Sequence, residues 1–169
     1  PDRVQQLPFD PDTRDLETLA AARFEDDRAP ANGSSIALLL AVDGRRILLG
    51  ADAHADVLRD RLRRLVDGRT GKIKLDAYKV SHHGSAANTS QELLALLDCS
   101  RYLISTSGAQ FQHPDPEAIA RIIKFGGTDT ALFFNYRSPF TASWDDEAAQ
   151  ARYKYNAVYG ADGSLTITL

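Results

Sequence analysis

Residues 34–50 read Ser34-Ser-Ile-Ala-Leu-Leu-Leu-Ala-Val-Asp-Gly-Arg-Arg-Ile-Leu-Leu-Gly50, and they contain the clearest structural signal in this chain. This stretch contains two apolar runs, and between them stands Asp43-Gly44, a pair that is typical of two-residue hairpin turns. The stretch therefore predicts an antiparallel pair of strands over residues 34–42 and 45–50.

Outside this hairpin, predicted strands alternate with predicted helices. Strands are expected over residues 76–80, 101–105 and 130–135, and helices over 12–25, 53–66, 90–97 and 114–123. The end of the chain, 156–169, is expected to form a second hairpin that turns at 161–163. This alternation, together with one antiparallel pair, predicts the α/β class with mixed strand directions.

Composition excludes several classes of protein. The 169 residues are enough for one domain, and no apolar run approaches the roughly 18 residues of a membrane span. The single cysteine, Cys99, excludes a disulfide framework and a cysteine-based zinc site. The net charge of −3 leaves no global basic field, so a surface for nucleic acid would have to be local. These features predict a cytoplasmic location.

Asp52 follows the second strand of the hairpin, after the small residues Gly50 and Ala51. An aspartate in this place can present its carboxylate to a ligand or a metal from a rigid strand end. The alternative is that Asp52 only caps a helix that begins at Ala53.

His82 and His83 follow the strand predicted over 76–80 and stand directly before Gly84. Adjacent side chains on an extended strand point to opposite faces, so one histidine is expected to bind an ion and the other either to hold that ligand in place or to contact substrate. The alternative is a pair of histidines with no role in a site.

The segment after the strand over 101–105 contains Ser105, Ser107 and Gly108, and it ends with His113 before a predicted helix. Hydroxyl groups and a histidine near a helix N-terminus are suited to holding a phosphate or another anion. The alternative is a polar loop whose residues only cap the helix.

Taken together, four blocks resemble the second half of a metallo-β-lactamase-fold hydrolase: residues 32–40, 46–52, 76–85 and 103–114. The most similar branch contains the nuclease domain of competence-type DNA-uptake proteins. The resemblance implies half of a four-layer αββα sandwich over residues 32–169. Residues 1–31 are then expected to form a linker and an N-terminal helix.

The resemblance also implies a set of site residues. Asp52 would be a bridging metal ligand and His83 the last histidine ligand, while His113 and His82 would take part in catalysis. Substrate contacts are expected from Asn32, Ser85, Ser105 and Ser107. The implied cofactors are two divalent metal ions, zinc with manganese as the alternative, and the implied reaction is cleavage of a nucleic acid phosphodiester by a hydroxide activated between them.

One part of the family pattern is missing from the sequence. The first metal motif, His-x-His-x-Asp-His, does not occur. A catalytic zinc needs about three protein ligands, and Asp52 and His83 supply two. We therefore expect the chain alone to bind the metals incompletely and to be inactive. The missing N-terminal half is expected in the same gene product or in a companion chain, which agrees with a chain that starts at Pro1 and contains no methionine.

Two other functions remain open at this point. The first is a non-catalytic binding or regulatory module with a degenerate metal site. The second is a metallo-hydrolase of a small ester, thioester or lactam, because one fold hosts many hydrolyses.

Two surface features carry alternatives of their own. The basic residues between Arg59 and Lys79 could form a local surface for nucleic acid or only a solvated helix face, since aspartates are interspersed. The aromatic residues near the C-terminus, Trp144 and Tyr155 among them, could stack on bases or pack in the core.

Overall fold

The Asp43-Gly44 turn reverses the chain as the sequence predicts. In the computed structural model, which describes Phe9 and residues 15–169, Asp43 has a φ of 49° and Gly44 a φ of 76°. Hairpin turns of this kind need two positive φ values, which glycine adopts freely and aspartate more readily than most residues. The turn joins β1 (Leu38–Val42) to β2 (Arg45–Leu49), which pair antiparallel with Val42 opposite Arg45.

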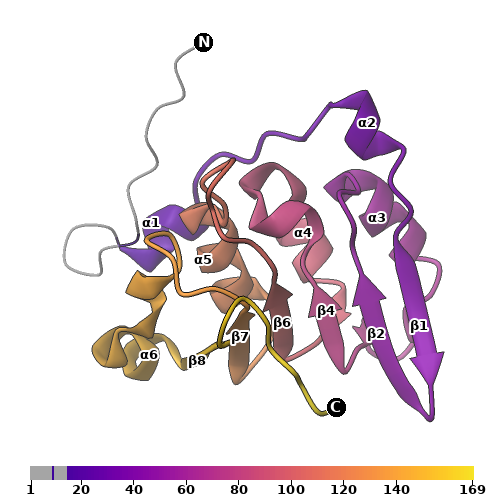
Figure 1. Ribbon diagram of the computed structural model, residues 1–169. Helices are drawn as coiled ribbons and strands as arrows, with labels where there is room; N and C mark the ends of the chain where they lie inside the picture. The colour runs from indigo at the N-terminus through magenta and orange to yellow at the C-terminus, as the bar shows by residue number, and fades with distance from the viewer. Residues whose placement is uncertain (1–8, 10–14) are drawn as a thin grey trace.

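A six-stranded sheet forms the centre of the molecule (Figure 1), in the order β1-β2-β4-β6-β7-β8. From β2 to β8 every neighbouring pair is parallel, so the predicted mixed α/β class is confirmed. The remaining strands of this sheet are β4 (Ala77–Lys79), β6 (Arg101–Ile104), β7 (Thr130–Phe134) and β8 (Tyr155–Tyr159). A separate small sheet pairs β3 (Ile73–Lys74) with β5 (Leu97–Asp98).

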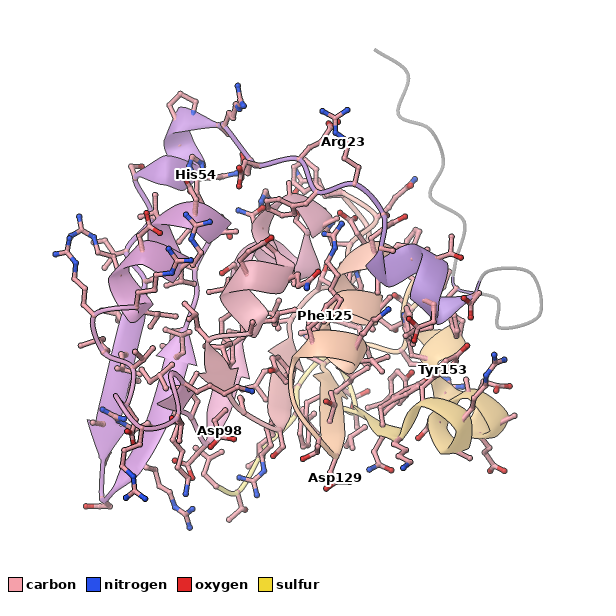
Figure 2. The ribbon with its side chains drawn as sticks, turned by 180° about the vertical axis from the view of Figure 1, so that it is seen from behind. Arg23, His54, Asp98, Phe125, Asp129 and Tyr153 are labelled. Carbon is pink, nitrogen blue, oxygen red and sulfur yellow. The ribbon has the colours of Figure 1, made fainter. Side chains whose placement is uncertain are left out.

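Helices α3 (Ala55–Leu62), α4 (Gln91–Leu94) and α5 (Pro116–Phe125) cover one face of the large sheet (Figures 1 and 2). Helix α1 (Leu16–Ala20) packs against α5, and Glu17 pairs there with Lys124. The other helical segments are α2 (Pro30–Gly33), α6 (Glu147–Tyr153) and the short 3-10 turns η1 (Ser81–Gly84), η2 (Ala86–Asn88) and η3 (Ala142–Asp145).

The core lies between the sheet and these helices. One row of paired side chains crosses the sheet on the helical side and is at most 1% exposed: Leu48, Tyr78, Tyr102 and Leu132. Trp144 and Tyr155 are buried too, with exposures of 0% and 2%, so these two aromatic residues belong to the core.

The opposite face of the sheet is apolar and only partly covered. Its central row runs through paired residues Leu38, Leu49, Lys79, Leu103, Phe133 and Val158. The C-terminal tail crosses part of this row (Figure 1), since Gly163, Leu165 and Ile167 line one cavity with Leu103 and Phe133. At the two ends of the row Leu38 is 47% exposed and Val158 is 37% exposed. We call this surface the open face.

Several local predictions are wrong. The helix expected over 12–25 ends at Ala20, and the helix expected over 90–97 ends at Leu94, with Leu97 in the strand β5. The helix expected from residue 53 begins at Ala55, and its N-cap is His54. The expected C-terminal hairpin does not form, because β8 pairs parallel with β7, and beyond it only one isolated bridge joins Ala161 and Ser164. Neither α6 nor η3 was predicted. Among the described residues, no helix has the length and apolarity needed to cross a membrane.

Candidate functional site

A cavity of about 580 Å³ lies where β2, β4 and β6 end. Because parallel strands place their carboxyl ends at the same edge of a sheet, the segments that follow them meet there. Asp52 follows β2, His82 and His83 follow β4, and His113 comes from the segment after β6. The lining residues are Asp27, Asn32, Asp52, His82, His83, Ser85, Ala87, Asn88, Phe111, Gln112, His113 and Asp115.

Asp52 faces this cavity and does not cap a helix, because α3 begins three residues later. The approach of the β2 and β4 ends requires Gly50, where a Cβ would lie 2.3 Å from the Ser81 hydroxyl oxygen. Asp52 is also close enough to Lys79 to stabilise the charged form of its amine. Burial lowers the pKa of the Lys79 amine, and the Asp52 carboxylate opposes that shift.

The two adjacent histidines do not lie on an extended strand, so the prediction that they point to opposite faces is wrong. His82, His83 and Gly84 have φ values of 43°, 56° and 85°, which is three successive residues in the left-handed region. Such backbone is costly for residues other than glycine and is concentrated at functional sites. Its consequence here is that both imidazoles line the same cavity, with ring centroids 6.3 Å apart.

Three histidines are held in the same manner, through Nδ1. Nδ1 of His82 lies 3.0 Å from Oδ1 of Asn88, that of His83 lies 2.6 Å from the Ser105 carbonyl oxygen, and that of His113 lies 2.9 Å from Oδ1 of Asp115. Each of these oxygens only accepts hydrogen bonds, and for His82 the Asn88 oxygen lies nearer than the Asn32 amide nitrogen, at 3.0 Å against 3.4 Å. Each imidazole is therefore assigned its proton on Nδ1 when neutral. The three Nε2 atoms keep their lone pairs for a ligand.

Asn88 has its amide orientation determined by its other contacts. Its Nδ2 donates to the carbonyl oxygens of Asp52 and Ala53, at 3.3 and 3.1 Å, and to the Asp27 carboxylate at 3.1 Å. The amide oxygen is therefore the atom that faces His82. This side chain is fully buried and ties the Asp52 segment to the histidine turn.

Asp27 belongs to the segment that the sequence assigns to a linker, and sequence reasoning missed it. Its carboxylate accepts hydrogen bonds from the Ala29 amide at 2.8 Å and from Asn32 Nδ2 at 2.7 Å, in addition to Asn88. Burial raises the pKa of Asp27, but these hydrogen bonds and the nearby His54 outweigh it, so the net pKa lies below its ordinary value. No pattern in the sequence around Asp27 marks it as a site residue.

Asp115 was also missed, since the sequence places it only in the first turn of a helix. It is the N-cap residue of α5, yet its side chain makes no capping bond. Its two carboxylate oxygens contact His113 and the backbone amide of Ala86. The sequence shows that Asp115 stands two residues after His113, but it does not show that their side chains bind each other.

The predicted substrate-binding residues fall into two groups. Asn32 and Ser85 line the cavity, and Asn32 Nδ2 lies 3.4 Å from Nδ1 of His82. Ser105 and Ser107 are not among the lining residues. Ser105 contributes its carbonyl oxygen to His83, and the Ser107 hydroxyl accepts a bond from the Ala109 amide.

Whether these residues fit a metal can be judged from their donor atoms. A backbone carbonyl on Nδ1 of His83 fixes the tautomer that presents Nε2 to a metal, and Asp52 offers a carboxylate. Within the part of the chain that the structure describes, however, no group of three or more histidine, cysteine, aspartate or glutamate side chains is placed to hold an ion. The described residues therefore do not form a complete metal site by themselves.

Comparisons with protein-family models, with curated proteins and with solved structures found no match to this chain.

Proposed function

We propose that this chain is the C-terminal part of a metal-dependent hydrolase that cleaves phosphodiesters, with nucleic acid as the substrate class. Asp52 and His83 are its contribution to a site for two divalent ions, zinc or manganese. His82 and His113 act on the substrate, and Asn32 and Ser85 contact it. The remaining metal ligands come from an N-terminal half in the same gene product or a companion chain.

The observation that carries this proposal is the common attachment of the three histidines. Their Nδ1 atoms are bound to acceptors from three different segments, and their Nε2 atoms are left for a ligand. Histidines that serve only as packing residues have no reason to share this arrangement around one cavity. An imidazole fixed in this manner can bind a metal or move a proton at a bound ester.

The open face supports the part of the proposal that concerns the missing half. Soluble proteins rarely leave a large apolar patch exposed, and Leu38 and Val158 mark the two ends of such a row. We propose that a second sheet covers this face and completes a four-layer αββα sandwich. The same second half would bring the absent metal ligands to the cavity.

The experiment compares the whole product of the encoding gene with the 169-residue chain. Both are assayed on single-stranded DNA, plasmid DNA and bis(p-nitrophenyl) phosphate, with zinc, manganese or a chelator present. We expect metal-dependent cleavage by the whole product. Asp52→Asn and His83→Gln should lower it by about 10²-fold or more, because both remove a proposed ligand.

Asp129→Asn is the matched control for Asp52→Asn, because Asp129 is exposed and does not line the cavity, and it should leave the rate unchanged. Circular dichroism of each variant shows whether the fold is retained. The proposal is wrong if the whole product cleaves no phosphodiester in any metal. Turnover of a small ester, thioester or lactam instead would assign the site to that other class of hydrolase.

A further inference from the structure

We propose that Asp115 is a positioning residue, which fixes the imidazole of His113 so that its unprotonated Nε2 serves the cavity. The reaction in which His113 would act rests on the proposed function. The arrangement of the two side chains does not, because it depends only on contacts within the described residues.

The carboxylate of Asp115 uses both of its oxygens. Oδ1 lies 2.9 Å from Nδ1 of His113, and Oδ2 accepts a hydrogen bond of 2.7 Å from the Ala86 backbone amide. Asp115 and His113 are 6% and 8% exposed, so water competes little for these contacts. The buried pair cannot rotate freely, since each partner is held by the other.

The surroundings of the carboxylate are also held in place. The Asp115 amide donates to the Gly84 carbonyl at 2.9 Å, which joins the start of α5 to the histidine turn. Arg121, which is 2% exposed, donates to the carbonyl oxygens of Ala86 and Thr89 at 2.8 and 3.0 Å. The Ala86 amide, which binds Asp115, therefore belongs to a segment that Arg121 holds in place. Arg121 lies in α5, the helix that begins directly after Asp115.

This arrangement determines which ring nitrogen is available. A carboxylate accepts the Nδ1 proton of His113, so the neutral ring has its lone pair on Nε2. Within the described residues Nε2 of His113 makes no hydrogen bond, and the ring lines the cavity 5.3 Å from the ring of His82. Nε2 can accept one proton from a water or hydroxyl group in the cavity. Asp115 then stabilises the imidazolium, and the same proton can be returned to a leaving oxygen.

An amide at position 115 cannot reproduce these contacts. In Asp115→Asn only one oxygen remains, whereas Asp115 uses one oxygen for His113 and the other for the Ala86 amide. The Ala86 N–H can only donate, while the His113 ring can change its tautomer, so the oxygen stays on Ala86 and the NH₂ group donates to Nδ1 of His113. The proton of the neutral ring must then move to Nε2, which removes the acceptor from the cavity.

The test is an NMR measurement of the histidine rings on the ¹⁵N-labelled 169-residue chain, at a pH about 1.5 units above the ordinary histidine pKa of about 6.5. His113→Gln assigns the signals. We expect His113 of the unchanged chain to show a protonated Nδ1 and an unprotonated Nε2. In Asp115→Asn, Nδ1 of His113 should become unprotonated and Nε2 protonated, while the two nitrogen signals of His83 should not change.

Asp129→Asn is the matched control, because Asp129 is an exposed carboxylate at the end of the sheet opposite to His54 (Figure 2), and it should leave every ring unchanged. The inference is overturned if His113 of the unchanged chain carries its proton on Nε2, a result that needs no variant to fold. It is also overturned if a folded Asp115→Asn keeps the original tautomer. Asp115→Glu, which retains two oxygens, should restore the protonated Nδ1.

This readout separates the inference from the proposed function. If no phosphodiester is cleaved, the proposed function is wrong but the His113 tautomer is unaffected. If the tautomer differs from the expected one, the role of Asp115 is wrong but the result of the cleavage assays is unaffected. If the whole gene product is active, Asp115→Asn should lower kcat by about 10²-fold or more with little change in KM, because a misplaced proton affects the chemical step rather than binding.

Discussion

Oδ1 of Asn88 lies 3.0 Å from Nδ1 of His82, and the same side chain donates to the segment that holds Asp52. One fully buried amide thus links two strand ends that are far apart in the sequence. Its contacts hold the cavity together before any ligand arrives.

Asn88→Ala should destabilise the chain by about 2–4 kcal/mol, because several buried polar partners lose their hydrogen bonds at once. Urea unfolding followed by circular dichroism measures this change. Asn156→Ala, at an exposed position on β8, should stay within about 0.5 kcal/mol. A loss below about 1 kcal/mol for Asn88→Ala would show that water replaces the amide easily.

Asp27 should make stability depend on pH at the acid end. Its folded pKa lies below the ordinary value of 3.8, so its contribution is present above that value and is lost as the pH falls through the folded pKa. The stability difference between the unchanged chain and Asp27→Asn should therefore be present above the ordinary value of 3.8 and shrink as the pH falls below it. Urea unfolding at a series of pH values measures it, and a difference that does not shrink below that value would contradict the assignment.

Cys99 should be unreactive in the folded chain. Burial raises the pKa of its thiol to about 11, and the side chain is 4% exposed, so little thiolate is present and reagents reach it slowly. Ellman's reagent at mildly alkaline pH should modify the native chain far more slowly than the chain in denaturant. Equal rates in the two states would mean that the edge of the sheet around Cys99 opens readily.

The open face should bind a hydrophobic dye. Leu38→Lys places a charge on this apolar row and should reduce dye fluorescence, while stability changes by about 0.5 kcal/mol or less because Leu38 is 47% exposed. Gln110→Lys adds the same charge at an exposed loop position and should leave the fluorescence unchanged. A chain that binds no dye and unfolds cooperatively as a monomer would show that the open face needs no covering partner.

Much of the fold could be predicted from local patterns in the sequence. The apolar runs around Asp43-Gly44 predict the hairpin, and the alternation that follows predicts the parallel strands β4, β6 and β7. These elements depend on near neighbours, on turn residues and on apolar periodicity, which a single sequence displays. The C-terminal segment was predicted wrongly, because residues 161–163 resemble a hairpin turn whereas β8 pairs parallel with β7.

The candidate site was predictable only in part, for a related reason. Asp52, His82, His83 and His113 follow predicted strands, so their meeting at one edge of the sheet follows from parallel topology. The left-handed turn at His82 and His83 could not be anticipated, because backbone of that kind is costly and persists only where surrounding contacts hold it.

Residue order alone is enough to predict the hairpin, the strands β4, β6 and β7, and the polar residues that stand at the strand ends. Folding in three dimensions is what joins Asp27 to the site through Asn88, 61 residues away, and turns Asp115 from its helix to His113. Hydrogen bonds between distant segments depend on the direction of each side chain after folding. Residue order does not carry that direction, since it arises when packed elements bring donors and acceptors within reach of one another.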